Sequence, residues 1–338
     1  MTGTRPRPRV SFIIPTLNAQ ALLDGCLQSI RRQHYPQELV EVLVMDGGST
    51  DRTTTIAEAY GARVVPNPHR LAEPGVALGQ QVGAGELFVV MAADNELPSE
   101  RWLSLMTACF EDSNVGGAYT HVMNSPMDPR FCRYVNLMHA DPFNWFVYGA
   151  AVDPRRFRDV FPVRRRDGYE IYQFRGYDRP LIALAQAFVI RAGLSRPGDS
   201  VNDDILPIWN LIDASYELAY VPEAGVYHHT LRSFPHFVRK FRTSIRRNLD
   251  VDNAGSLARR ALLSAAQRRR QYLWFLYSFS VLFPFIDALR GWRRDRDPAW
   301  LYHPLACGSL SIIMLSQLLR ARIQHLWDGA IEKGHARA

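Results

Sequence analysis

Several acidic side chains stand directly after short apolar runs of this sequence. Asp46 and Asp51 follow the run at residues 40–45, and Asp94 and Glu96 follow the run at residues 87–91. Short apolar runs rich in branched residues are typical of buried parallel strands, and such sheets bind ligands beyond the carboxyl ends of their strands. Carboxylates held there can bind a divalent cation or accept a proton. The pattern predicts a ligand crevice lined with acids.

The segments that carry these acids alternate between strand and helix patterns. Residues 10–18 contain a buried strand that Pro15 stops, and residues 19–33 place apolar side chains at helical spacing. Further elements are predicted at 40–45, 53–60, 63–65, 67–85, 87–91, 99–110, 116–123, 183–191, 202–215 and 217–221. This order predicts an α/β fold, with a Rossmann-like, mostly parallel sheet and helices on both faces.

Composition and charge narrow the class of protein. The 338 residues are 47% hydrophobic and 22% charged, which allows a sizeable core and excludes a disordered chain. The net charge of +7 comes almost entirely from arginine, but the basic residues alternate with long apolar stretches, so we do not expect a nucleic-acid partner. Four unpatterned cysteines predict neither a disulfide framework nor a zinc site, and the polar N-terminus predicts no signal peptide and a cytoplasmic site.

The C-terminal third has a different composition. Residues 230–271 hold eleven Arg or Lys against two Asp, and an aromatic and aliphatic stripe recurs there at helical spacing. A basic helix with such a stripe suits either an anionic membrane interface or docking on the rest of the protein. The apolar stretches 272–289 and 304–319 are at or below the length of about 20 residues that spans a bilayer. Arginines between them oppose full spanning, which predicts an in-plane or re-entrant pair on the cytoplasmic leaflet.

Two segments resemble a known family. The stretch SFIIPTLNAQALLDGCLQSIRRQHYP, followed by VEVLVMDGGSTDRT, is similar to the opening of the family-2 inverting glycosyltransferases, which have the GT-A fold. By element order the resemblance covers roughly residues 10–230. It implies a glycosyltransferase domain at 1–230 with an acceptor-side insertion at 115–200, a basic amphipathic helical region at 231–271 and a membrane-associated helical hairpin at 272–325.

The resemblance implies where a nucleotide sugar, with UDP as the expected nucleotide, would bind. The turn containing Pro15, Thr16 and Asn18 would flank the base and ribose together with Asp46, whose carboxylate can accept the N3–H of uracil. Asp51 would support the turn or the ribose, and Asp94 would lie near the diphosphate. The alternative is that Asp46 and Asp51 only cap and shape their turn.

The family places an Asp-x-Asp motif where this chain has Ala92-Ala93-Asp94, so the first aspartate is missing. Side chains two apart in an extended segment point the same way, so Asp94 and Glu96 could meet one Mg²⁺ or Mn²⁺ ion. His228 would be a third ligand by resemblance. The alternatives are an exposed Glu96, a structurally packed His228, and a metal-independent site in which arginines neutralise the diphosphate.

The resemblance also implies a general base. Asp204 would take the proton of the acceptor hydroxyl as it attacks the anomeric carbon, with Asp203 assisting, and this single displacement inverts the configuration. The alternative is that both acids cap the helix they precede.

The same resemblance bears on the acceptor. No Gln-x-x-Arg-Trp processivity motif follows the acids, so we expect transfer of one sugar to a lipid-linked or cell-surface glycan, as in polysaccharide biosynthesis at the cell envelope. The basic side chains expected to contact lipid phosphates are Arg239, Lys240, Arg242, Arg246 and Arg247. The alternative reading is a catalytically inactive membrane scaffold, favoured by Ala92 and by the absence of the usual Arg-Asn pair ahead of residues 83–86.

Overall fold

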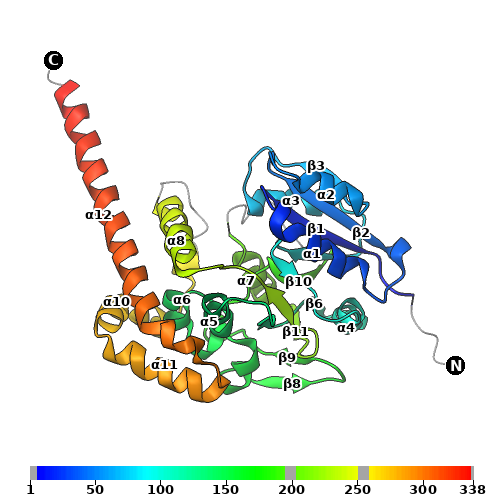
Figure 1. Cartoon of the computed structure of the whole chain (residues 1–338). Coiled ribbons are helices and arrows are strands. Elements are labelled where there is room, and N and C mark those ends of the chain that lie inside the picture. The colour runs from blue at the N-terminus through cyan, green and yellow to red at the C-terminus, as the bar shows by residue number, and fades with distance from the viewer. Residues whose placement is uncertain (1–5, 195–202, 250–258, 336–338) are drawn as a thin grey trace.

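The computed structural model describes residues 6–194, 203–249 and 259–335, with side chains left out for residues 247–249 and 324–335. A nine-stranded sheet forms its centre, in the order β3-β2-β1-β4-β10-β6-β11-β9-β8 (Figure 1). The strands are β1 (Val10–Thr16), β2 (Val40–Asp46), β3 (Arg63–Pro66), β4 (Leu87–Met91), β6 (Val115–Tyr119), β8 (Val163–Arg165), β9 (Glu170–Tyr172), β10 (Gln186–Arg191) and β11 (Glu217–Tyr220). Strands β3, β2, β1 and β4 are parallel, and β10 is antiparallel to its neighbours β4 and β6.

Two apolar cores cover the two faces of this sheet. In β1, Phe12 and Ile14 pack into one core and Ile13 into the other, and all three are fully buried. This explains the continuous apolar runs, because a strand covered on both faces has no polar side. The helices of this half are α1 (Gln20–Arg31), α2 (Thr53–Ala59), α3 (Ala72–Val82), α4 (Trp102–Ala108) and α7 (Leu206–Asp213). The predicted start of α7 at Asn202 lies outside the described residues.

A small second sheet lies at the end of β4. It has the order β5-β12-β7, formed by β5 (Asn95–Glu96), β12 (Val226–His228) and β7 (Val122–Met123). The segment predicted as one strand at 116–123 is therefore divided between two sheets, as β6 and β7. Strand β12 pairs antiparallel with β5, which brings the end of the C-terminal strand to the residues that follow β4.

The region predicted as an insertion does not form a separate unit. Its β8–β9 hairpin extends the main sheet through β11. Its helices α5 (Arg130–Met138) and α6 (Pro142–Tyr148) pack against the C-terminal helices. These are α8 (Phe234–Leu249), α10 (Ala265–Phe279), α11 (Leu282–Asp295) and α12 (His303–His335). Together they form a third core that includes Phe131, Tyr134, Phe237, Trp274 and Trp300.

Candidate active site

The turns after β1 and β2 are joined by hydrogen bonds. The paired ends of the strands place Thr16 beside Asp46. The Asp46 carboxylate is buried and accepts the backbone N–H groups of Gly48 and Ser49, each at 3.0 Å, and the Ser49 hydroxyl at 2.5 Å. Asp46 therefore shapes its own turn, as the structural alternative predicted. Its proposed contact with a nucleobase stays a prediction.

Asn18 and Asp51 connect the same two turns. Asn18 adopts a left-handed backbone (φ 52°), and its side-chain oxygen accepts the Thr50 N–H at 2.9 Å. The Asp51 carboxylate accepts the Gln20 N–H at 3.2 Å and the Thr53 hydroxyl at 2.5 Å. These bonds hold the Pro15–Asn18 and Asp46–Asp51 segments side by side as one rigid edge of the crevice.

Asp94 sits in a turn at the end of β4. The turn is closed by the Asn95 N–H donating to the Ala92 carbonyl at 3.0 Å, and the His229 N–H donates to the Asp94 carbonyl at 2.9 Å. One carboxylate oxygen of Asp94 lies 3.6 Å from His228 Nε2, while the other, Oδ1, is buried with no hydrogen-bond partner. Burial lowers the pKa of His228, although the charge of Asp94 acts in the opposite direction. The lowered pKa keeps the imidazole neutral and able to bind a metal. An orphaned carboxylate oxygen beside a neutral imidazole suits a divalent cation.

Glu96, the other acid expected at this ion, follows the turn at Ala92–Asn95. It pairs with Tyr227 on β12, one residue from His228. Its carboxylate lies 3.4 Å from His229 Nε2. Within the described residues, no group of three His, Cys, Asp or Glu side chains forms a metal site.

His229 belongs to a second cluster that the sequence reasoning missed. Its Nδ1 lies 2.8 Å from the almost fully buried carboxylate of Asp128. The hydrogen bond to Asp128 raises the pKa of His229, with a further contribution from Glu96. The doubled histidine at 228–229 was the available signal, but nothing in the sequence connects it to Asp128.

The two candidate catalytic acids have different environments. Asp203 Oδ1 accepts the N–H groups of Ile205 and Leu206 at 2.8 and 2.9 Å, so Asp203 shapes the turn that leads into α7, whose N-cap residue is Ile205. The Asp204 carboxyl forms no ion pair with another described residue. Burial, and then the charge of Asp203, raises the pKa of Asp204 to about 6. Asp204 is thus the member of the pair suited to exchange a proton near neutral pH.

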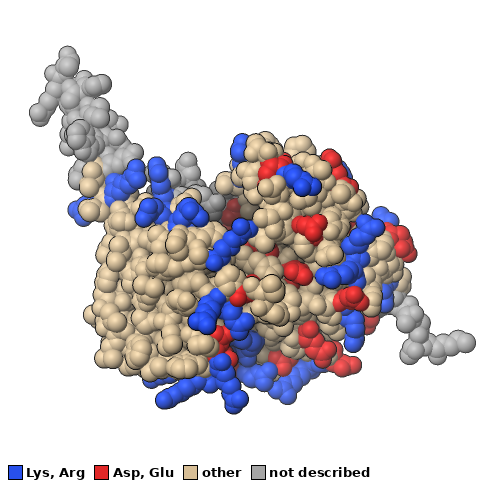
Figure 2. Space-filling view, in the orientation of Figure 1, with Lys and Arg blue, Asp and Glu red and all other residues tan. Residues whose placement is uncertain are grey.

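A short backbone segment brings Asp204 and Asp94 to one place. The Leu184 N–H donates to the Asp204 carbonyl at 2.9 Å. The next carbonyl, that of Ala185, accepts the Ala92 N–H at 3.0 Å and the Asn95 side chain at 2.7 Å. Because β1 lies between β2 and β4, the Asp94 turn neighbours the turn after β1, which is itself hydrogen-bonded to the Asp46 turn. Figure 2 shows acidic atoms inside the hollow that divides this face of the molecule.

The basic helix α8 buries its aromatic stripe inside the protein and exposes several of its arginines. The aromatic stripe points inward: Phe234 and Phe237 both contact Phe131, with ring centroids 5.6 and 5.3 Å apart. The alternative of a docked helix therefore accounts for the stripe. Among the predicted lipid contacts, Arg239, Arg242 and Arg246 are exposed, Lys240 donates to the Thr230 hydroxyl at 2.7 Å, and the Arg247 side chain lies outside the described part.

The exposed apolar surface lies farther along the chain, at the corner between α10 and α11. The two helices meet at 96° around Val281, and Leu276, Phe283 and Phe285 are 71%, 55% and 46% exposed. In Figure 2 the corresponding half of the face is nearly free of charge, with basic side chains above and below it. Residues 298–323 form one helix long and apolar enough to cross a membrane, and one third of it is buried in the protein, which is weak evidence for spanning.

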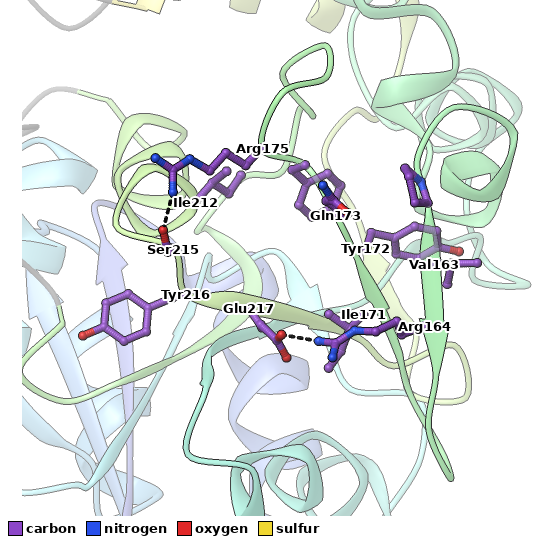
Figure 3. A pocket seen from close by; sticks show the side chains of 12 residues that line it. Val163, Arg164, Ile171, Tyr172, Gln173, Arg175, Ile212, Ser215, Tyr216 and Glu217 are labelled. Atoms are coloured by element: carbon purple, nitrogen blue, oxygen red, sulfur yellow. Dashed lines mark hydrogen bonds and ion pairs between the residues drawn. The ribbon is translucent and has the colours of Figure 1, made fainter.

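A separate pocket of about 350 Å³ lies on the far side of α7, between the β8–β9 hairpin and the start of β11 (Figure 3). Arg175 donates to the Ser215 hydroxyl at 2.6 Å on one wall, and Arg164 pairs with Glu217 on the other. The acids described above follow the carboxyl ends of strands, whereas this pocket lies at the amino end of β11. It is therefore distinct from the crevice.

Comparisons with solved structures agree with this architecture. A mannosyltransferase from Pyrobaculum calidifontis, solved with GDP-mannose and Mn²⁺, superimposes with a TM-score of 0.52 at 16% identity, covering 92% of this chain and 88% of its own. At that identity the likeness shows the fold alone. It confirms the expected GT-A architecture with added C-terminal helices.

Curated relatives match over shorter stretches. A PGL/p-HBAD biosynthesis glycosyltransferase of Mycobacterium bovis is 38% identical over 98 residues, 27% of this chain and 37% of its own length. A validoxylamine A glucosyltransferase of Streptomyces hygroscopicus is 44% identical over 57 residues, 17% of this chain and 13% of its own. The chain thus spans little more than a third of the first of these relatives.

A family-level match covers half of the chain. The model of glycosyl transferase family 2 matches residues 11–182, which include the turns of Asp46 and Asp94 and end before the Asp203–Asp204 pair and His228. The resemblance seen in the opening segments is confirmed by this match, and the chain belongs to glycosyl transferase family 2.

Proposed function

We propose that the protein is an inverting glycosyltransferase that moves one sugar from a nucleotide donor, with UDP as the expected nucleotide, to an acceptor hydroxyl. The observation that supports this most is the Asp204 carboxyl, whose pKa of about 6 suits a general base. The backbone carbonyl of the same residue is hydrogen-bonded to Leu184, and Ala185 is bonded in turn to the Asp94 turn. The membership of the chain in glycosyl transferase family 2 points to the same class of reaction.

The residues of the crevice have distinct roles in this proposal. The edge made by Pro15, Thr16, Asn18, Asp46 and Asp51 receives the base and ribose. Asp204 accepts the proton of the attacking hydroxyl, which adds to the anomeric carbon from the face opposite the leaving diphosphate. Asp203, held by the N–H groups of α7, fixes the backbone that carries Asp204.

Asp94 and His228 would hold a Mg²⁺ or Mn²⁺ ion, which stabilises the negative charge of the departing diphosphate when bound. The orphaned Asp94 Oδ1 supports this assignment, and Glu96 is not part of it. The Mn²⁺ ion reported for the Pyrobaculum mannosyltransferase supports a metal in this fold.

We further propose that the acceptor is a lipid-linked or cell-surface glycan and that the protein works at the cytoplasmic face of the membrane. The support is the exposed apolar corner of α10 and α11, together with the exposed Arg239, Arg242 and Arg246 of α8, which would contact lipid phosphates. Release of the protein from membranes by alkaline carbonate is expected, since the corner would lie in the plane of the interface. Retention in the pellet would indicate a spanning segment instead.

A catalytically inactive scaffold is the second candidate. It is favoured by the hydrogen bonds that occupy Asp46 within its own turn and by Ala92 in place of the first motif aspartate. Thermal denaturation with UDP, with and without Mn²⁺, separates the two. A rise in melting temperature is expected for the enzyme, and no rise in either condition would favour the scaffold.

The assay for activity is a screen of nucleotide sugars by donor hydrolysis. We expect at least one donor to be hydrolysed. The Asp204→Asn variant should retain the UDP-induced thermal shift and lose transfer, because it lacks only the proton acceptor. Transfer by this variant at the wild-type rate would exclude Asp204 as the base.

A further inference from the structure

A charged side chain from the C-terminal extension reaches the two acids of the crevice. The guanidinium of Arg259 lies 3.6 Å from Asp203 Oδ2, on the side opposite the N–H groups that bind Oδ1. Both side chains are largely shielded from solvent, at 23% and 5% exposure. Neither an acid-pair motif nor a helical pattern predicts this contact, because Arg259 lies beyond β12 and α8 in the sequence.

The segment that carries Arg259 is fixed to the catalytic half by buried contacts. Leu263 packs into the core that also contains Ile205 and Trp209. Gln267 is fully buried, donates to the Arg179 carbonyl at 3.0 Å and forms a capping box with Ser264 at the start of α10. These contacts hold residues 259–267 against α7 on one side and begin the hydrophobic helices on the other.

The charges around Asp204 come from three elements. Asp203 on the same segment and Glu73 on α3 raise the pKa of Asp204, whereas Arg259 lowers it. Burial raises the pKa of Tyr148, at the end of α6, so its hydroxyl stays neutral. The charges of Arg259 and Asp203 also act on this pKa, in opposite directions. One oxygen of Asp203 is thus bound by N–H groups and the other lies beside a guanidinium, which fixes the orientation of this side chain.

We propose that Arg259 is a positioning residue for transfer: its ion pair with Asp203 fixes the segment that carries Asp204 and places a positive charge beside both acids. This inference rests on the proposed function, in which Asp204 is the general base. It also means that the C-terminal extension completes the crevice, because the arginine and the first hydrophobic helix belong to one short segment.

The test is the pH profile of kcat/KM for the full-length protein with its donor and acceptor. The acidic limb of the wild type should fall near pH 6. Loss of the guanidinium in Arg259→Gln should move this limb upward by about one pH unit. At pH 6 the variant would then be about fivefold slower than the wild type, with little difference at pH 8.

Two matched variants isolate the charge. Arg259→Lys keeps a cation and should restore most of the shift. Arg260→Gln removes the exposed neighbour, whose side chain forms no hydrogen bond or ion pair with another described residue, and should leave the profile unchanged. Melting temperatures are measured in parallel, so that loss of folded protein is separated from a shift of the limb.

The results distinguish failure of the role proposed for Arg259 from failure of the role proposed for Asp204. An unmoved limb in Arg259→Gln, or a uniform loss of rate at all pH values, would overturn the positioning role while leaving Asp204 as base, provided that Asp204→Asn is inactive. Full transfer by Asp204→Asn would overturn the proposed base itself, and with it this inference. A shifted limb that Lys restores would support both.

Discussion

A partly buried carboxyl group with a raised pKa should cost stability, and Asp204 allows this cost to be measured. Its pKa is raised from 3.8 to about 6 by burial and by the neighbouring charge of Asp203. A raised native pKa means that the folded protein binds the proton more tightly than the unfolded chain. Stability therefore falls as the pH rises from about 4 to about 6 and stays lowered above that range.

The size of the effect follows from the two pKa values. Each pH unit between them corresponds to about 1.4 kcal/mol, which gives an upper limit of about 3 kcal/mol at pH 7. Partial exposure of Asp204 reduces this figure. The amide of Asp204→Asn cannot ionise, so we expect this variant to be inactive and yet more stable than the wild type at neutral pH.

The measurement is urea denaturation of both proteins between pH 4 and pH 8. Only the difference in unfolding free energy is informative, because other carboxyl groups titrate equally in the two chains. This difference should grow in favour of the variant up to about pH 6 and then level off. A variant less stable than the wild type at pH 7, or a difference independent of pH, would show that the Asp204 carboxylate is stabilised in the fold and refute the reasoning.

Three further perturbations follow from the contacts. Gly79→Ala would place a Cβ 2.4 Å from Ile13 Cγ2 where α3 crosses β1, so it should destabilise by about 1–3 kcal/mol in chemical denaturation; an unchanged midpoint would show that α3 can shift. Asp128→Asn should lower the pKa of His229 in an NMR titration, so stability should be lost more at pH 6 than at pH 8, and an unmoved resonance would exclude the pairing. Leu276→Asp, at a 71% exposed position, should change stability by less than about 0.5 kcal/mol and weaken binding to anionic vesicles at least about tenfold; unchanged binding would exclude the α10–α11 corner as the membrane contact.

The parallel half of the sheet could be predicted from local patterns alone. The centres of strands β1, β2 and β4 are buried on both faces, so each contains a short apolar run in the sequence. Their ends are marked by the acids and by the hydrogen-bonding turn residues, which is why the Asp46 and Asp94 turns were located correctly. Strands β8 and β9, by contrast, are three residues each, too short to show a period.

The partners of the site residues could not be predicted from local sequence patterns, because they come from distant parts of the chain. Asp94 lies beside His228 and Glu96 beside His229, although the spacing of the two acids in an extended chain predicted a shared ion. The partner of His229 is Asp128, and the partner of Asp203 is Arg259; each pair joins distant parts of the chain. Such pairs are set by the packing of the third core and of residues 259–267, which sequence periodicity does not report.

The C-terminal helices show why an amphipathic pattern does not identify its partner. The stripe of α8 would suit a bilayer, but its rings meet Phe131 and one another inside the protein, and that burial removes them from any lipid surface. The α10–α11 corner has a weaker pattern and leaves large apolar side chains in solvent. For the membrane association proposed above, the corner and not the stripe would supply the free energy of binding, since exposed apolar area is what a membrane removes from water. A basic helix beside such a corner would then add attraction to anionic lipid without inserting.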